Sequence, residues 1–183
     1  MDRIGQDIRA LRKARGMTIA DCAAALARSI GWLSQVERGL TVPSVHDLGQ
    51  IAALFGVNIG FFFRSASRHP DEQGLIVRAA DRSAIGSAES GLYEELLSPG
   101  LTGAFEMIRS VFAPGAASPA SRPPREVEHG GVLVAGRLTL ILDGRRFDLR
   151  PGDSFQFNAR PYGWENPGDE PAEVIWIVSP PVY

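Results

Sequence analysis

The residues that this sequence has in short supply exclude several classes of protein. It contains a single cysteine, Cys22, so an internal disulfide framework is excluded, and we expect the thiol to be packed in a helical core. Three histidines in the whole chain are too few for a histidine-rich metal centre. No apolar run approaches the roughly 20 residues that span a bilayer, and the first residues contain no apolar signal core. We therefore expect a cytoplasmic protein.

The net charge is also small, but it is unevenly distributed. The whole chain has a formal charge of -2, whereas residues 1–38 hold seven basic and four acidic side chains, which gives +3 there and leaves -5 for the remainder. A basic head on an acidic body is typical of a DNA-binding module joined to a second domain. A chain of 183 residues, 44% of them hydrophobic, is long enough for two small globular domains.

Apolar spacing predicts a compact all-α bundle in residues 1–63. Glycines, which tolerate the left-handed backbone that ends a helix, follow several of the apolar stripes. The five expected helices cover about 2–15, 19–26, 30–38, 45–55 and 58–63.

Short polar side chains stand where three of these helices begin. Thr18 with Asp21, and Ser44 with Asp47, have the spacing of capping boxes, although aspartate replaces the usual glutamate. Ser29 is placed to cap the third helix. The second and third helices, separated by a tight break near 27–29, have the outline of a helix-turn-helix, whose second helix lies in a DNA major groove.

Three segments carry a specific resemblance. TIADCA at 18–23, WLSQVERG at 32–39 and LGQIAALFGV at 48–57, with Pro43-Ser44 between the last two, resemble the XRE-type helix-turn-helix of the phage repressors over about residues 4–63. The chain departs from that pattern where the family usually has a glycine, an aliphatic residue and a leucine. These positions hold Ala27, Arg28 and Cys22.

The resemblance implies which side chains meet DNA. Gln35 is the one long amide on the third helix and is able to pair with an adenine, while Ile30 is able to meet a thymine methyl group and Gly31 permits close approach. The positions that face base edges or nearby phosphates are Ser29, Ile30, Gly31, Ser34 and Gln35. The candidate phosphate contacts, which position the protein without specifying sequence, are Arg12, Arg28, Arg38, Thr41 and Ser44.

Beyond the head the periodicity changes. Residues 64–74 are polar, contain proline and glycine and are interpreted as a linker, and His69 within it receives no role. The rest of the chain alternates apolar and polar residues between regular turn signals, which is typical of an antiparallel sandwich or barrel. The expected strands lie in 103–111, 131–135, 137–142, 146–149, 154–157, 163–166 and 173–178.

The turn signals themselves resemble those of the small β-barrel called the cupin, over about residues 75–183. They are GRL at 136–138, DG at 143–144, LRPGD at 149–153 and RPYGWENPG at 160–168. Many cupins hold a metal through two neighbouring histidines, a glutamate and a third histidine. Here no histidine lies in 121–125, and the other two positions hold His129 and Tyr162. The resemblance therefore implies no metal and no cofactor, with a weak improvised site at Glu126, Glu128 and His129 left open.

A barrel without metal ligands leaves space for an organic ligand. The inward positions of a cupin correspond to His129, Gly131, Leu133, Phe155, Phe157, Tyr162, Trp164 and Trp176. An aromatic cavity with a few polar groups is the general form of a small-molecule site, although several of these rings could equally be core. The expected effector-binding residues are Arg109, Arg122, Arg125, His129, Arg160, Tyr162 and Trp164. Four arginines favour a carboxylate-bearing effector, whereas Glu126 and Glu128 could equally serve an amine.

Together these features predict an α+β chain with a five-helix DNA-binding domain at 1–63, a linker at 64–74 and a cupin β-barrel at 75–183 for sensing and dimerisation. The leading hypothesis is a transcription regulator without enzymatic activity, which binds a palindromic operator in double-stranded DNA as a homodimer and responds to a small effector. A metal-dependent cupin oxidoreductase with an accessory helix-turn-helix domain is the alternative, disfavoured by the missing ligands. A third possibility is a cupin that only dimerises.

Overall fold

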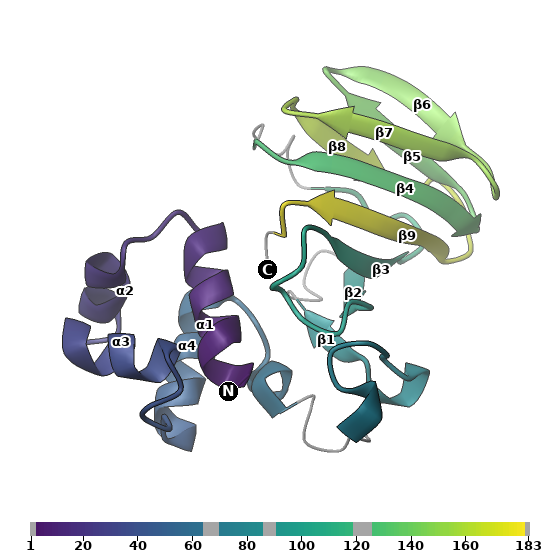
Figure 1. The fold of residues 1–183 in the computed structure, drawn as a ribbon. Helices are drawn as coiled ribbons and strands as arrows, with labels where there is room; N and C mark the ends of the chain where they lie inside the picture. Colours follow the sequence, from purple (N-terminus) through teal and green to yellow (C-terminus); the bar gives the residue numbers. More distant parts are fainter. Residues whose placement is uncertain (1–2, 64–69, 86–90, 119–125, 182–183) are drawn as a thin grey trace.

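A computed structural model describes residues 3–63, 70–85, 91–118 and 126–181, and it places a helical head beside a β-rich body (Figure 1). The head contains four α-helices and one short 3-10 helix. They are α1 (Arg3–Ala14), α2 (Ile19–Ala25), α3 (Ile30–Glu37), α4 (Val45–Phe55) and η1 (Ile59–Phe63). Among the described residues, no helix is long and apolar enough to cross a membrane.

The prediction of a fifth α-helix is wrong, because 58–63 forms only the 3-10 helix η1. The side chain of Asn58 accepts a hydrogen bond from the Gly60 backbone N–H at 2.8 Å, which favours a tight turn over a longer helix. Phe61 and Phe62 then turn inward and pack edge to face with their ring centroids 5.5 Å apart. The Phe61 and Phe62 side chains of η1 therefore extend the apolar core of the head next to α4.

The predicted caps are confirmed. The Thr18 and Ser44 side chains accept hydrogen bonds from the backbone N–H groups of Asp21 and Asp47, and both aspartates bond back to complete capping boxes. The Ser29 side chain accepts a bond from the Trp32 N–H at 3.1 Å. These bonds satisfy backbone donors that a helix otherwise leaves open at its N-terminus.

The turn between α2 and α3 keeps its geometry without glycine. Ala27 has a φ of 52°, in the left-handed region that alanine rarely adopts. Its N–H donates to Ala24 and the Arg28 N–H donates to Ala23, so two backbone bonds hold the strained residue in place. Alanine at this position therefore carries local backbone strain.

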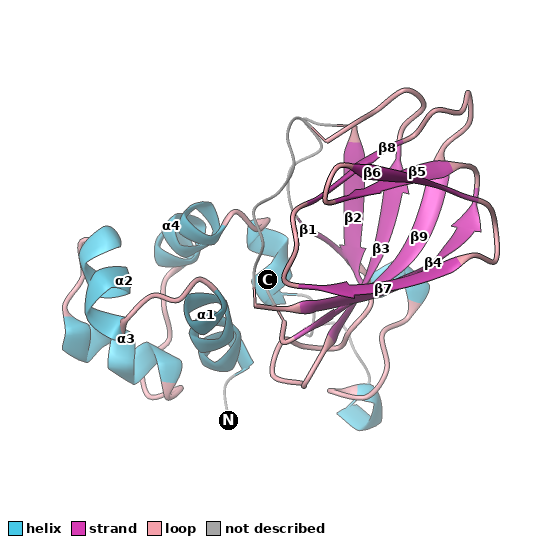
Figure 2. Cartoon of the chain, turned by 90° about the horizontal axis from the view of Figure 1, so that it is seen from above, coloured by secondary structure: helices cyan, strands magenta, loops and turns pink. Residues whose placement is uncertain are grey.

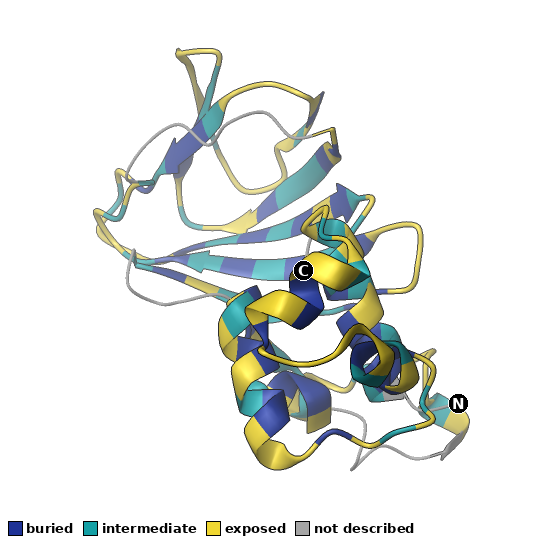
Figure 3. Ribbon diagram, turned by 90° about the vertical axis from the view of Figure 1, so that its left-hand side faces the viewer, coloured by how far each residue is buried: buried dark blue, intermediate teal, exposed yellow. Residues whose placement is uncertain are grey.

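The head is packed around α1 and α3. Ile8, Leu11 and Leu33 have no exposed surface, and the buried sides of the helices face one another in Figure 3. α1 approaches α3 closely because Gly5 lies against the end of α3, where a Cβ atom would come within 2.2 Å of the Val36 carbonyl oxygen. Cys22 is buried in this core, as expected, and burial raises the pKa of its thiol.

The described residues of the body form nine strands, paired antiparallel in two sheets (Figure 2). One sheet has six strands in the order β1-β2-β3-β9-β4-β7, and the other has three in the order β6-β5-β8. The strands are β1 (Ser83–Ile85), β2 (Leu92–Leu96), β3 (Glu106–Phe112), β4 (Glu128–Ala135), β5 (Leu138–Leu142), β6 (Arg145–Leu149), β7 (Ser154–Asn158), β8 (Tyr162–Glu165) and β9 (Ala172–Ser179).

The predicted closed barrel is not formed by the described strands, because their ladders stay within two separate sheets. The segment that follows β3 is described only as far as residue 118. Its described part makes only an isolated bridge from Ala117 to Glu165, flanked by bonds such as that from the Ser118 N–H to the Trp164 carbonyl. The body is therefore a sandwich of two facing sheets.

Sequence periodicity missed the elements between the head and β3. Two short 3-10 helices, η2 (Pro70–Glu72) and η3 (Ala79–Asp81), precede β1, and η2 lies inside the segment interpreted as a linker. β1 spans three residues, too few to show an alternation. An isolated antiparallel bridge joins Val57, directly after α4, to Ile85 of β1. The head thus contacts the edge strand of the large sheet.

The strain at Ala27 gives a stability prediction. Ala27→Gly should raise the free energy of unfolding by about 0.5–1 kcal/mol, because relief of the left-handed penalty exceeds the entropy cost of glycine. Ala24→Gly, at an exposed position inside α2, is the matched control and should lower it by about 0.5–1 kcal/mol. Urea unfolding measures both, and two decreases would show that Ala27 carries no strain.

Candidate functional site

The outer side of α3 and the residues around it form an open surface. Ser29, Gly31 and Gln35 are exposed, and Ile30 keeps 53% of its surface accessible although it is a large apolar residue. Leu33 and Val36, on the opposite side, are buried in the head. One face of α3 therefore packs in the head core and the other is exposed to solvent, as is required of a helix that enters a major groove.

Gln35 is oriented by a neighbour. The Thr41 hydroxyl donates a hydrogen bond to Gln35 Oε1 at 2.9 Å. A carbonyl oxygen has two lone pairs, so Oε1 retains one acceptor position and Nε2 retains its donors. This leaves the amide able to make the paired donor and acceptor contacts that adenine requires. Thr41, predicted as a phosphate contact, is thus placed beside the residue predicted to read the base.

Arg12 is mostly buried by bonds within the head, and its role as a phosphate contact stays a prediction. Its guanidinium makes two bonds to the Glu37 carboxylate, at 2.6 and 2.9 Å, and donates a third to the Met17 carbonyl. The side chains are only 11% and 6% exposed, and the bond to Glu37 is the main cause of the raised pKa of Arg12. The pair fixes α1 to the end of α3.

Arg28 is used inside the head as well, although it stays half-exposed. Its guanidinium pairs with Asp47 at 2.5 Å and lies 5.1 Å from the centre of the Trp32 ring. Hydrogen bonding from Ser44, with a smaller contribution from Arg28, lowers the pKa of the Asp47 carboxyl. The depressed pKa means that Asp47 stabilises the head at neutral pH and loses that contribution as the pH falls through the lowered value.

The other predicted phosphate contacts differ in whether their side chains already have bonding partners within the head. Arg38 is exposed and forms no ion pair among the described residues, and its Nε donates to the Ser34 carbonyl at 3.2 Å. Ser44 is exposed but serves as the cap of α4. Of the three predicted arginines, Arg38 therefore keeps its charge most available.

A second cluster fills the space between the two sheets. His129 lies against Phe157 and Tyr162 with ring centroids 4.9 Å apart in each case, and Phe155 and Trp176 complete the set at 4.7 Å from one another. Tyr162 comes from the small sheet and the other four from the large one, so the cluster joins the sheets. Five of the eight inward positions implied by the cupin resemblance thus lie together, and their role as effector contacts stays a prediction. We call these five residues the aromatic cluster.

One hydrogen bond orders the aromatic cluster. Trp176 Nε1 donates to His129 Nδ1 at 3.1 Å, and His129 is 7% exposed. Because Nδ1 accepts, a neutral His129 carries its proton on Nε2. Phe155 fits here because position 131 is a glycine, where a Cβ atom would come within 2.5 Å of the Phe155 ring. Tyr162 and Phe155 are the partly exposed members and give the cluster its contact with solvent.

Arg109 does not belong to this site, contrary to the sequence prediction. It lies on the other side of β3, where it bonds the Glu173 carboxylate at 2.6 and 2.8 Å and Glu95 at 3.1 Å. The bonds to Glu173 are the main cause that raises the pKa of Arg109, and they lower the pKa of Glu173. Inward and outward residues alternate along a strand, which puts Arg109 on the outer face while Ile108 faces in.

The other predicted effector residues are divided. Arg160 lies beyond the sheet edge, with one nitrogen 3.4 Å from the Asp143 carboxylate. Trp164 is buried and packs against Phe112 with ring centroids 4.6 Å apart, so it belongs to the core. Arg122 and Arg125 lie outside the described residues. Arg109 therefore no longer supports a carboxylate-bearing effector. Arg160 already lies near the carboxylate of Asp143.

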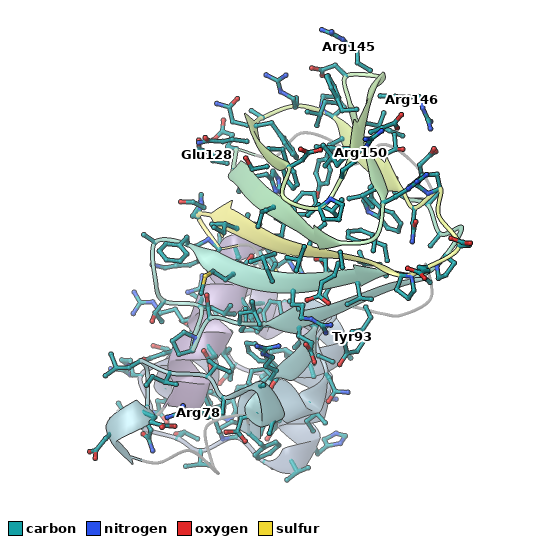
Figure 4. All side chains as sticks on the ribbon, turned by 90° about the vertical axis from the view of Figure 1, so that its right-hand side faces the viewer. Arg78, Tyr93, Glu128, Arg145, Arg146 and Arg150 are labelled. Carbon is teal, nitrogen blue, oxygen red and sulfur yellow. The ribbon has the colours of Figure 1, made fainter. Side chains whose placement is uncertain are left out.

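The improvised metal site is not assembled. His129 points between the sheets, whereas Glu128 points outward from the end of β4 and accepts a hydrogen bond from Gln156 (Figure 4). Glu126, the third candidate, is exposed. In the part of the chain that the structure describes, no three His, Cys, Asp or Glu side chains gather to hold a metal ion.

Sequence reasoning missed the pairings that occupy these polar groups. The partners of Arg12, Arg28 and Arg109 lie 25, 19 and 64 residues away, beyond any local pattern. The orienting bond from Thr41 to Gln35 spans six residues and a helix end. Only the three-dimensional arrangement reveals which of several exposed-looking arginines are already used.

Comparison with known protein families divides the chain in the same way. Residues 3–59 match the model of the helix-turn-helix domain, and residues 108–178 match the model of the cupin domain. The strands β1 and β2 precede the second match and extend its sheet.

Individual relatives agree with both assignments. The chain is 22% identical over 181 residues to the HTH-type transcriptional regulator PuuR of Escherichia coli, which covers 98% of this chain and 96% of that protein. It is 31% identical over 85 residues to the HTH-type transcriptional regulator DdrOP3 of Deinococcus deserti, which covers 43% and 66%. The body shares the fold of KdgF from Halomonas sp., with a TM-score of 0.50, 19% identity and coverage of 59% and 94%.

The buried pair of Arg12 and Glu37 predicts a large effect on stability. Arg12→Ala should lower the free energy of unfolding by about 3–5 kcal/mol, because it leaves a buried carboxylate without its partner. Arg9→Ala, an exposed arginine of the same helix, is the control and should change it by less than about 0.5 kcal/mol. A phosphate contact would behave oppositely: Arg12→Ala would leave urea unfolding unchanged and weaken DNA binding at all sequences.

Proposed function

We propose, for a chain that belongs to the XRE-type helix-turn-helix transcriptional regulators with a C-terminal cupin domain, that a homodimer binds a palindromic operator and that the cupin binds a small effector which modulates this binding. Residues 1–63 form the DNA-binding domain, and 75–183 the sensing and dimerisation domain. The DNA-binding role places the protein in the cytoplasm. The observation that carries the proposal is the exposed face of α3, with Gln35 held by Thr41.

A dimer is favoured by the size of the reading surface. Gln35 is the one long amide on α3, Gly31 has no side chain to read a base, and Ile30 offers an apolar contact. A single head with so few contacts gives too little affinity, whereas two heads on half-sites one helical turn apart double the contacts. Because few side chains on α3 contact base edges, part of the specificity must come from half-site spacing and DNA shape.

Gln35 gives the sharpest test of the reading face. Gln35→Ala should weaken binding to the selected operator by about 1–3 kcal/mol, the usual discrimination of a bidentate amide contact. Gln50→Ala, which removes an exposed glutamine from α4 in the same head, should leave affinity unchanged. Operators selected from random duplexes and fluorescence anisotropy at fixed salt provide the measurement. Equal affinities for the two variants would show that the base-reading face is elsewhere.

The effector site that the geometry favours is the solvent side of the aromatic cluster. Tyr162 and Phe155 are its partly exposed rings, and they lie on opposite sheets. A small organic ligand that packs against both would change how the sheets are spaced. Any effect on operator binding is then a coupling free energy, typically about 1–3 kcal/mol, between the cupin and the heads.

A thermal-shift screen against a metabolite library tests this site. A compound present at about 100 times its Kd should stabilise the protein by about 2.7 kcal/mol, and Tyr162→Ala should abolish the shift. Tyr93→Ala removes a tyrosine that is 44% exposed on β2 and should keep the shift (Figure 4). If no compound stabilises the protein, the cupin serves only dimerisation.

Enzymatic activity is the competing function. The relatives that match along the chain are transcriptional regulators, and His129 and Tyr162 occupy positions where metal-bearing cupins have ligands. We propose that the chain is not an enzyme. Stoichiometric, tightly held iron in the purified protein would instead support an oxidoreductase with an accessory helix-turn-helix domain.

A further inference from the structure

A cleft of about 590 Å³ separates the head from the cupin. One wall is the side of α1 that faces away from the head core, together with the end of α3. The opposite wall comes from the segment that follows β2 and from the prolines that follow β9, whose end approaches α1 in two perpendicular views (Figures 1 and 2). Its volume lies within the range of small-molecule sites. It does not involve any residue of the aromatic cluster.

The two walls differ in chemistry. The head contributes the cations Arg9, Lys13 and Arg38, whereas the cupin contributes Leu101, Pro180 and Pro181. Leu101 is 3% exposed, so the apolar surface open to a ligand comes mainly from Pro180, which is exposed, and Pro181, which is partly exposed. A molecule that fits this cleft needs an apolar part on one side and polar groups on the other.

The charge on the head wall is positive and uncompensated. Among the described residues, none forms an ion pair with Arg9, Lys13 or Arg38. Glu37 is the one acidic residue of the lining, and its two carboxylate oxygens are both bonded to Arg12. Its charge is therefore already neutralised within the head, and three cations remain for a ligand.

The geometry points to a second binding site, in which an amphipathic organic anion packs its apolar part against Pro180 and Pro181 and its anionic group against Arg9, Lys13 and Arg38. Such a ligand contacts both domains at once. Its affinity depends on how the domains are placed, and by linkage it stabilises the placement that it binds best. Arg38 directly follows α3, so this placement includes the DNA-reading helix.

Isothermal titration of the 183-residue chain with octanoate tests the site. Octanoate should bind at least about tenfold more tightly than 1-octanol, which has the same chain without the charge. The charge reversals Arg9→Glu and Lys13→Glu together should weaken octanoate binding by at least about tenfold. Arg145→Glu with Arg150→Glu makes the same charge change on the far side of the cupin and should have no effect (Figure 4).

A variant with a larger side chain in the cleft serves as a control for indirect effects of the charge reversals. Thr102 lines the cleft and is exposed, so Thr102→Trp should fold, as judged by its circular dichroism and urea unfolding, and should block octanoate. Octanoate should also change the operator affinity of the natural protein and not that of Thr102→Trp. The cleft does not rest on the effector site of the cupin, so Tyr162→Ala should leave octanoate binding intact.

Three results would overturn the proposal. Equal binding of octanoate and 1-octanol would remove the role of the cations. Octanoate binding that survives Thr102→Trp but is lost in Tyr162→Ala would move the ligand to the aromatic cluster. Charge reversal that weakens operator binding without ligand, and leaves octanoate binding unchanged, would make the basic wall a DNA contact.

Discussion

The ion pair between Arg12 and Glu37 is the interaction on which the arrangement of the head depends. It joins α1 to the end of α3 across 25 residues and is almost completely shielded from water. Inside a protein such a pair is costly to break, because either partner alone is a buried charge. The angle at which α3 is presented is thereby tied to α1, and α1 in turn forms a wall of the cleft toward the cupin. The ion pair therefore helps to connect α3 with the helix that faces the second domain.

Local signals predicted the helical head well, because the interactions that begin and end its helices are themselves local. The capping boxes of Thr18 and Ser44 span three residues each, and the turn at Ala27 needs only its own backbone bonds. η1 was mispredicted as a fifth helix of the bundle, although the segment 58–63 is too short to show the i, i+3, i+4 spacing of an α-helix. The 3-10 turn is instead favoured by the Asn58 side chain, which competes for a backbone donor.

The interior of the cupin could be predicted, whereas its charged groups could not. The cupin resemblance implied that His129, Phe157 and Trp176 face inward, and the pairing of β4 with β7 and β9 brings them into one space. Whether an arginine faces a ligand or an internal carboxylate depends on residues far along the chain. Arg109 pairs with Glu173 across neighbouring strands, and the register of that pairing is not encoded near either residue.

The bridge between Val57 and Ile85 changes how the connection between the domains is understood. Because the residue that follows α4 pairs with the edge of the large sheet, the chain between them closes a loop and does not act as a spacer. Doubling the length of a flexible loop costs only about 0.6 kcal/mol. By this scale, a longer segment costs little free energy as long as the bridge between Val57 and Ile85 is kept. The same contact also shields an edge strand that would otherwise be open to aggregation.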